Sequence, residues 1–249
     1  MKSVRIGIMT TLWKRPELSR IVLSYYASLK VEGVEFTLLA AGSEGRSSRA
    51  LAKECGWYYV SVPNDPLGAK HNRALKAVCK FDIDCVVVIG SDDLCNVKYF
   101  ERVRDDYRDD IEALSMDGVY YHNLETGETV YVDKVNTGAG RMLSLGLCKR
   151  RSFKGWPDEK NTMLDGSMHT PILKWARPKP YYINNPDVAG IVVVDIKGAG
   201  TQMWSHAQMT DITKHKRRTI LNTKNFFDEH FPGVLGKLKA IKQTQYNGK

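Results

Sequence analysis

Apolar and polar positions follow two alternating patterns over the first part of the chain, up to about residue 95. Continuous apolar runs of strand length alternate with longer segments whose apolar residues recur at helical spacing. The runs predict strands over Val4–Met9, Glu35–Ala40, Trp57–Val62 and Cys85–Ile89. The periodic segments predict a helix from Pro16 to about Leu29 and helices over Arg49–Cys55 and Gly68–Cys79. This order favours an α/β fold with a mostly parallel, doubly wound sheet and helices on both faces.

The pattern changes in the second half of the chain. Gly118–Tyr121 and Thr129–Val132 flank a turn that contains a glycine, which predicts a β-hairpin. Further on we expect a helix around Gly166–Trp175, a strand at Val188–Ile196 and a helix over about Lys224–Lys242. No linker divides the sequence, so we predict one domain over residues 1–249. We expect a nucleotide-binding half (about 1–95), an acceptor and catalytic half (about 96–210) and a basic helical C-terminal segment (about 211–249).

Ligands of doubly wound sheets bind at the carboxyl ends of the strands, so the residues that follow each strand are the first candidates. The apolar run at residues 86–89 stops in Ser91, Asp92 and Asp93. Successive side chains of an extended chain point opposite ways, so one carboxylate can bind a metal while the other orients a hydroxyl. Carboxylate oxygens suit Mg²⁺ or Mn²⁺. The alternative interpretation is a polar turn that caps the next helix.

Other segments carry polar residues in patterns that suit binding or catalysis. The predicted helix at Gly68 opens with Lys70, His71 and Asn72, and a helix N-terminus attracts phosphate; a basic exposed face is the alternative. Gly138, Gly140 and Arg141 form a segment that permits close approach to a ligand, although most such segments are only turns. Asp165 is a candidate general base or a helix N-cap. His206 follows a glycine-rich, aromatic segment, where a structural role is the alternative.

In this order the motifs resemble the GT-A glycosyltransferases, especially the family 2-like group, from about Arg5 to His206. The resemblance implies donor-binding residues in the loop after the first strand, at the start of the third helix and in a DxD-like motif whose first aspartate is replaced by Ser91. These donor-binding residues are Thr10, Thr11, Arg15, Gly68, Lys70, Asn72 and Asp92. The resemblance further implies a metal at Asp93 and His206, a catalytic Asp165, and acceptor contacts from Gly138, Gly140, Arg141 and Trp156.

The resemblance also implies an activity. We expect a hexosyl- or pentosyltransferase that uses Mn²⁺ or Mg²⁺ and moves a sugar from UDP or GDP to an acceptor hydroxyl. A nucleotidyltransferase shares the sheet and the metal carboxylates, but it should carry glycines directly after the first strand, and residues 10–15 contain none. A basic nucleic-acid-binding module without catalysis is the second rival. The sequence leaves the donor sugar, the inverting or retaining outcome and the oligomeric state open.

Charge and composition bear on the acceptor and the compartment. The net charge is +9, with a basic cluster at residues 214–218 and further lysines beyond it, which favours an anionic partner; a solvated helix face is the alternative. DNA bearing a hydroxymethylated base is one candidate acceptor, as for small phage DNA-modifying glycosyltransferases, and a glycan or lipid-linked acceptor is the alternative. The sequence shows neither a membrane-length apolar segment nor a signal peptide, and its five cysteines have no CxxC spacing. We therefore expect a cytoplasmic protein with reduced thiols.

Overall fold

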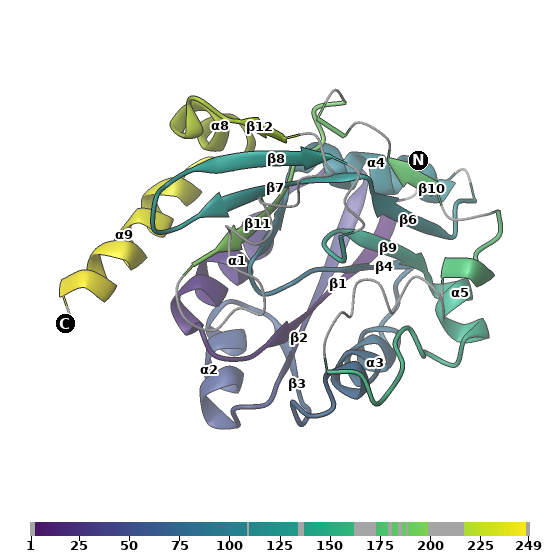
Figure 1. The fold of residues 1–249 in the computed structure, drawn as a ribbon. Helices are drawn as coiled ribbons and strands as arrows, with labels where there is room; N and C mark the ends of the chain where they lie inside the picture. The colour runs from purple at the N-terminus through teal and green to yellow at the C-terminus, as the bar shows by residue number, and fades with distance from the viewer. Residues whose placement is uncertain are drawn as a thin grey trace.

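The computed structural model describes residues 3–108, 110–133, 137–161, 173–178, 181–183, 186–187, 189–198 and 217–247. Two β-sheets and the helices packed around them form this part of the chain (Figure 1). One cluster of buried apolar side chains includes residues of both sheets and of helices near each end of the chain, among them Ile8, Tyr120 and Phe227. The two sheets therefore share one hydrophobic core.

The larger sheet has the strand order β10-β6-β9-β4-β1-β2-β3. Its parallel part consists of β1 (Val4–Leu12), β2 (Val34–Gly42), β3 (Tyr58–Ser61) and β4 (Cys85–Val88). The intervening helices are α1 (Pro16–Ser28), α2 (Arg46–Glu54) and α3 (Leu67–Val78). Buried residues of α1 and α2 pack on one face of this sheet and those of α3 on the other. The predicted doubly wound, mostly parallel α/β fold is confirmed.

The remaining strands of the larger sheet come from the second half of the chain. They are β6 (Ala113–Met116), β9 (Arg141–Ser144) and β10 (Tyr181–Ile183). Strand β9 is antiparallel to both β4 and β6, whereas β10 is parallel to β6. Helix α4 (Val97–Arg108) precedes β6, and α5 (Leu145–Arg150) directly follows β9.

A second sheet of five strands has the order β12-β8-β7-β11-β5. The predicted hairpin is confirmed as β7 (Gly118–Asn123) and β8 (Thr129–Asp133), which pair antiparallel. The other strands are β5 (Asp93–Cys95), β11 (Val193–Lys197) and β12 (Arg217–Thr219). The sequence did not predict this sheet, because strands as short as β5 and β12 do not show a periodic pattern.

Three predicted boundaries differ from the structure. Strand β1 continues to Leu12, so its last residues do not form a loop. Strand β11 begins at Val193 rather than Val188. The C-terminal segment is two helices, α8 (Thr223–His230) and α9 (Val234–Asn247), separated by Pro232 and by Gly233 with φ +74°. Helix α9 packs against α1, and Figure 1 shows it reaching the opposite side of the molecule from α5.

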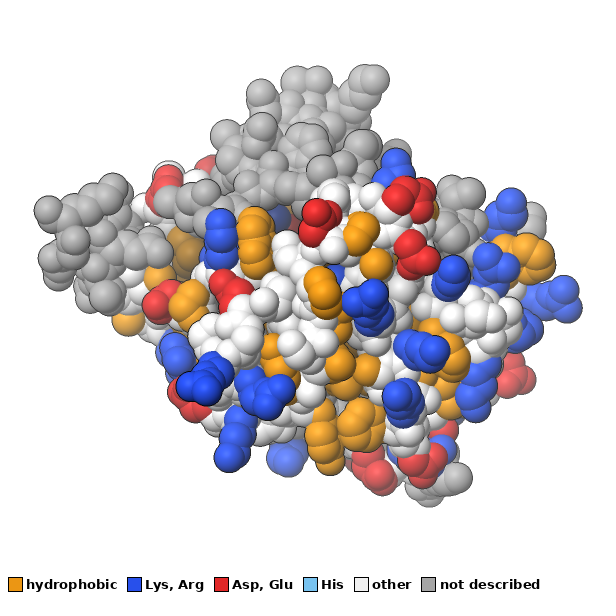
Figure 2. All heavy atoms as spheres, turned by 90° about the horizontal axis from the view of Figure 1, so that it is seen from below, with side chains coloured by type: hydrophobic (Ala, Val, Ile, Leu, Met, Phe, Trp, Pro, Cys, Tyr) orange, Lys and Arg blue, Asp and Glu red, His pale blue; other side chains and the backbone are white. Residues whose placement is uncertain are grey.

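The expected helix at Gly166–Trp175 falls mostly outside the described residues, which contain only the short 3₁₀ turn η1 (Leu173–Trp175). All five cysteines are buried free thiols, as expected. None of the helices among the described residues has the length and apolar character needed to cross a membrane. Figure 2 shows one face of the molecule, on which Lys and Arg side chains stand in separate groups with uncharged surface between them.

Candidate active site

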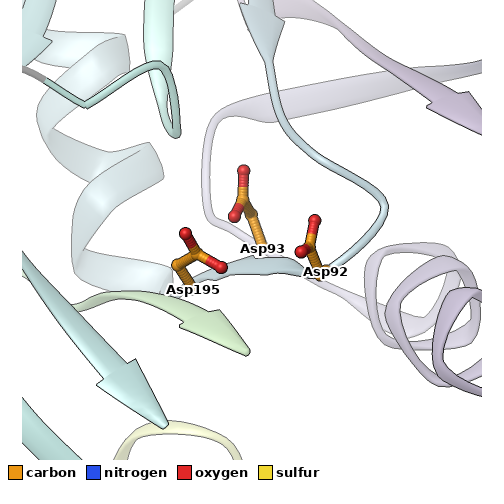
Figure 3. Close-up of side chains that lie close together, drawn as sticks. All are labelled: Asp92, Asp93 and Asp195. Atoms are coloured by element: carbon orange, nitrogen blue, oxygen red, sulfur yellow. The ribbon is translucent and has the colours of Figure 1, made fainter. Parts of the chain in front are cut away.

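Three carboxylates meet where the chain passes from the larger sheet to the smaller one. After β4 the chain turns at Gly90 and enters β5 at Asp93, immediately preceded by Asp92. Strand β11 pairs antiparallel with β5, and this register sets Asp195 opposite Asp93. One oxygen from each carboxylate lies within 4.8 Å of the others, and Figure 3 shows the three groups projecting to the same side of the backbone.

Gly90 allows the carboxylates to approach the backbone. Its N–H donates to Asp93 Oδ2 over 2.5 Å. A Cβ atom at position 90 would lie 2.7 Å from Asp92 Oδ1 and 2.8 Å from Asp93 Oδ2, closer than packed atoms tolerate. Any other residue at position 90 would therefore displace the carboxylates.

Two basic side chains bond to this cluster within the described residues. The Arg15 guanidinium donates to Asp92 Oδ2 over 2.9 Å and to Ser91 Oγ over 3.3 Å. Lys197 Nζ lies 2.6 Å from Asp195 Oδ2, and its side chain is only 11% exposed. Three carboxylates and two cations leave a formal charge of −1 on these five groups.

The site shifts the pKa values of the neighbouring Asp92 and Asp93 in opposite directions. Burial, followed by repulsion from Asp195 and Asp92, raises the pKa of Asp93 well above its usual range. Burial would also raise the pKa of Asp92, but Arg15 and Lys197 outweigh it, so the pKa of Asp92 is lowered. A further cation beside Asp93 would favour its ionised form.

The Arg15 side chain reaches the cluster from an unusual backbone turn. Lys14 and Arg15 have φ of +55° and +50°, in the left-handed region that residues other than glycine rarely adopt. The Lys14 N–H donates to Glu44 Oε2 over 2.9 Å, and Pro16 begins α1 directly afterwards. Conformations of this kind persist where the surrounding structure holds them, often at functional sites. Arg15 was expected in the donor site, and the structure brings its side chain to Asp92.

The two threonines expected in the loop before Arg15 belong to β1 instead. Thr10 is completely buried. The next side chain in a strand points to the other face, and Thr11 Oγ1 lies 3.4 Å from His71 Nε2. The expectation of a loop here is wrong, because β1 pairs with β2 as far as Leu12.

The start of α3 was expected to present free N–H groups to phosphate, but these groups bond within the chain. Their acceptors belong to residues 155–161, which we call the 155–161 loop. The bonds are Leu67 N to Asn161 Oδ1 at 2.7 Å, Gly68 N to Lys160 O at 2.7 Å and Ala69 N to Asp158 O at 3.2 Å. The helix dipole therefore acts on protein oxygens in this structure.

Both the nitrogen and the oxygen of the Asn72 side-chain amide form hydrogen bonds with the same loop. Its Nδ2 donates to Trp156 O over 2.7 Å and to Asp158 Oδ1 over 2.8 Å. Its Oδ1 accepts from the N–H groups of Gly155 and Trp156 at 2.9 and 3.0 Å. The Asn72 side chain thus holds the loop in one conformation, and the Trp156 ring packs against His71 with centroids 4.7 Å apart and planes tilted by 47°.

Lys70 is also engaged within the chain. Its ammonium donates to Leu12 O over 2.6 Å, to Asn64 Oδ1 over 2.8 Å and to Ser43 Oγ over 3.3 Å. These oxygens belong to the segments that end or follow the first three strands. Burial lowers the pKa of Lys70 to about 8.

The predicted acceptor segment divides into two environments. Gly140, with φ +67°, donates its N–H to Val88 O over 3.0 Å, and a Cβ there would lie 3.4 Å from Cys95 Sγ of β5. Gly138 and Gly140 thus belong to the turn that leads past the carboxyl end of β4. Arg141 lies in β9 and is completely buried, so it does not face solvent.

Two predicted site residues, Asp165 and His206, lie outside the described residues. Two residues at the site were missed, Asp195 and Lys197. The signal in the sequence was the alternation Asp195-Ile196-Lys197, directly after the apolar run at residues 191–194. Charged residues two apart on a buried strand share a face and need partners, which pointed to a polar site on that face.

No protein-family model and no curated protein matches the sequence. Solved structures with a similar fold include S. aureus TarS 1-349 in complex with UDP, with a TM-score of 0.56 and 10% identity over 100% of this chain and 72% of that one. Another TarS 1-349 structure has a TM-score of 0.51 and 14% identity over 75% of this chain and 61% of that one. Mannosyltransferase PcManGT from Pyrobaculum calidifontis, in complex with GDP-Man and Mn²⁺, has a TM-score of 0.52 and 14% identity over 82% of this chain and 59% of that one.

The likeness to these structures confirms the predicted GT-A-like fold. At 10–14% identity the likeness concerns the fold alone. The chain spans 61% of TarS 1-349 in one comparison and 35% of a longer TarS structure in another.

Proposed function

We propose that this protein is a metal-dependent glycosyltransferase that moves a sugar from a UDP- or GDP-linked donor to an acceptor hydroxyl. The observation that carries the proposal is the meeting of Asp92, Asp93 and Asp195 at the carboxyl end of β4, in a GT-A-type fold. That edge of a parallel sheet is where such folds bind ligands. The similar TarS and mannosyltransferase structures carry UDP and GDP-Man with Mn²⁺, respectively.

The geometry of the carboxylates fits a small divalent cation. Oxygens bound at roughly 2.1 Å to one ion lie at most about 4.2 Å apart. The three carboxylates offer oxygens within 4.8 Å of one another, so a small shift of these side chains would let them bind one ion. Gly90 lets the Asp92 and Asp93 carboxylates lie close against the backbone. We infer that Asp93 binds Mn²⁺ or Mg²⁺, with His206 as a second ligand. When bound, the metal supplies positive charge to the departing diphosphate.

The chain's own residues orient the donor. The ion pair with Arg15 keeps Asp92 ionised, so that its carboxylate accepts a hydrogen bond from a ribose or sugar hydroxyl. Thr10 and Thr11, which precede the last residue of the central strand β1, remain our candidates on the donor side. We infer that Gly68, Lys70 and Asn72 act indirectly: Lys70 fixes the ends of the strands, and the other two fix the 155–161 loop. Gly138, Gly140 and Trp156 remain our candidates for the acceptor side, and the buried Arg141 would support that side from within β9.

Asp165 is the proposed base for an inverting reaction. Its carboxylate would take the proton of the acceptor hydroxyl while the acceptor oxygen bonds to the anomeric carbon. The bond from that carbon to the diphosphate oxygen breaks, and the nucleoside diphosphate leaves with the electron pair. In a retaining reaction Asp165 would orient the acceptor or the sugar instead. Asp165→Asn should lower turnover by about 10²-fold or more with little change in donor affinity; an equal loss of donor affinity would assign Asp165 to the donor site or the core.

The net charge of +9 favours an anionic acceptor, and DNA with a hydroxymethylated base is the first one to test. Within the basic cluster at residues 214–218, the Arg218 guanidinium is bonded to Asp187 over 2.5 Å. Replacing Lys214, Lys216, Arg217 and Arg218 by Ala should weaken DNA binding and flatten its salt dependence, by about 0.9 in log–log slope for each lost phosphate contact. If labelled DNA does not bind at low salt, a glycan or lipid-linked acceptor is the one to pursue.

The experiment that tests the function is a thermal-shift panel of UDP- and GDP-sugars, each with Mn²⁺ and with a chelator. We expect stabilisation by one nucleotide class in the presence of Mn²⁺, since a bound ligand stabilises the folded state by mass action. A shift with nucleoside triphosphates and none with nucleotide-sugars would indicate a nucleotidyltransferase. If no nucleotide shifts the thermal midpoint, a nucleic-acid-binding module without catalysis would be the remaining candidate.

A further inference from the structure

Lys197 is a buried cation inside the carboxylate site. It lies two residues after Asp195 on β11, so both side chains are on the same face of the strand. Its Nζ is 2.6 Å from Asp195 Oδ2 and 5.9 Å from the centre of the Tyr121 ring. The side chains of Lys197 and Asp195 are only 11% and 14% exposed. A lysine so placed loses much of its hydration, and the structure compensates it with carboxylates.

The position of this ammonium relative to a metal follows from the same contacts. Asp195 contributes one of the three oxygens that lie within 4.8 Å of one another, and the ammonium touches that carboxylate. A metal held by Asp93 would therefore lie within a few ångströms of the Lys197 charge. Like charges at such a separation repel strongly in a partly buried site. Arg15 does not take the same place, because it bonds to Asp92 and Ser91 on the other side of the cluster.

We propose that Lys197 is a built-in counter-cation that competes with the divalent metal for the carboxylate site. Without metal, its ammonium offsets the repulsion among Asp92, Asp93 and Asp195 and keeps them together. With metal, the same charge lowers the affinity of the site. The inference rests on the proposed function for the identity of the metal, and it makes Lys197 a positioning residue that sets how much metal the protein needs.

The consequence is a pair of opposite effects from one substitution. Removing the charge in Lys197→Met should lower the thermal midpoint of the metal-free protein, because the carboxylates lose their counter-charge. The same change should raise the affinity for Mn²⁺ by about tenfold or more, because a repelling charge is gone. A lysine that only fills space would give the first effect without the second.

The experiment is a calorimetric titration of Mn²⁺, without nucleotide, into the metal-free full chain, combined with thermal unfolding in a chelator. Lys197→Arg keeps the charge and should behave like the wild type in both measurements. Lys197→Gln keeps a donor for Asp195 without the charge and serves if Lys197→Met does not fold. Lys70→Met is the matched control, because Lys70 is also a buried lysine but bonds to neutral oxygens.

Unchanged or weaker Mn²⁺ binding in both uncharged variants of Lys197 would overturn the inference, as would tighter binding in Lys70→Met. If the wild type does not bind Mn²⁺ but Lys197→Met does, the inference holds and the metal dependence of the wild type fails. If the wild type binds Mn²⁺ through Asp93 and the uncharged Lys197 variants bind it no better, the proposed function stands and the inference fails. If no variant binds Mn²⁺, both fail.

Discussion

Two regions near the carboxyl ends of the strands were expected to bind the donor. Their polar groups are engaged differently in the structure. At the start of α3, the N–H groups of Leu67, Gly68 and Ala69 and the Asn72 amide all bond to the 155–161 loop. At the carboxylate cluster, three acidic groups share two cations. The first region is satisfied within the chain, whereas the second gathers three carboxylates around two cations among the described residues.

The difference shows which feature marks a ligand site. The first region carries Lys70 and Asn72 and the second carries carboxylates, but both lie where a sheet of this kind binds ligands. A helix N-terminus whose groups are bonded within the chain has little left to offer a phosphate. A bound cation favours the ionised form of buried carboxylates. Substitutions in the first region should therefore change stability, and those in the second should change ligand binding.

The largest expected effect lies in the carboxylate cluster. Asp93→Ala should lower the affinity for Mn²⁺ together with UDP or GDP by about 100-fold or more, because it removes the proposed metal ligand. The circular dichroism spectrum and the thermal midpoint in a chelator should stay close to those of the wild type. Calorimetric titration measures the affinity. Wild-type binding by this variant would remove Asp93 from the metal site.

The next effect concerns the packing of α3 against the 155–161 loop. A Cβ at position 68 would lie 2.1 Å from the Pro157 carbonyl oxygen. Gly68→Ala should therefore lower the free energy of unfolding by about 2–3 kcal/mol. In Gly236→Ala, the control in α9, the added Cβ meets no atom within 4 Å, and the free energy of unfolding should rise by about 1 kcal/mol. Denaturant unfolding compares the two, and equal effects would contradict the close contact.

A somewhat smaller loss of stability is expected from Asn72→Ala. The N–H groups of Gly155 and Trp156 would lose their acceptor in a buried place, at a cost of about 2 kcal/mol. Urea unfolding measures this cost. Nucleotide affinity should change less than threefold or so, since Asn72 acts on the loop. A loss of affinity as large as that of Asp93→Ala would instead make Asn72 a donor contact.

The smallest effect is a pH dependence near the same helix. Burial, followed by repulsion from Lys70, lowers the pKa of His71 to about 3, so the folded protein keeps this ring neutral below the usual value near 6.5. The unfolded chain then binds the extra proton, and stability falls as the pH drops from about 6.5 toward 3. Between pH 7 and 5.5 the free energy of unfolding should fall by at most about 1.4 kcal/mol, because partial exposure of the ring reduces the effect.

The control for this pH effect is His71→Gln, which cannot take up the proton. Urea unfolding at pH 7 and at pH 5.5 gives the free energy of unfolding for both proteins. The variant should lose less stability than the wild type over this interval. An equal loss in the two proteins would show that His71 is not the group responsible.

The sequence by itself determined the parts of this protein that depend on neighbouring residues. Continuous apolar runs such as Cys85–Val88 identified the parallel strands, and the glycine turn after β7 identified the hairpin. Asp92 and Asp93 were candidates because they follow a buried strand at the sheet edge and match the DxD-like motif of the family that the sequence resembles. Each of these signals lies within a few positions along the chain.

Only the tertiary structure decided which distant residues complete the site. Asp195 meets Asp93 because β11 pairs with β5 in one register, and a shift of one residue would turn Asp195 to the other face of the sheet. The N–H groups at the start of α3 donate to the 155–161 loop, which no local sequence pattern connects to this helix. Pairing between remote strands and loops depends on how the core packs as a whole, so the spacing of residues along the chain does not encode it.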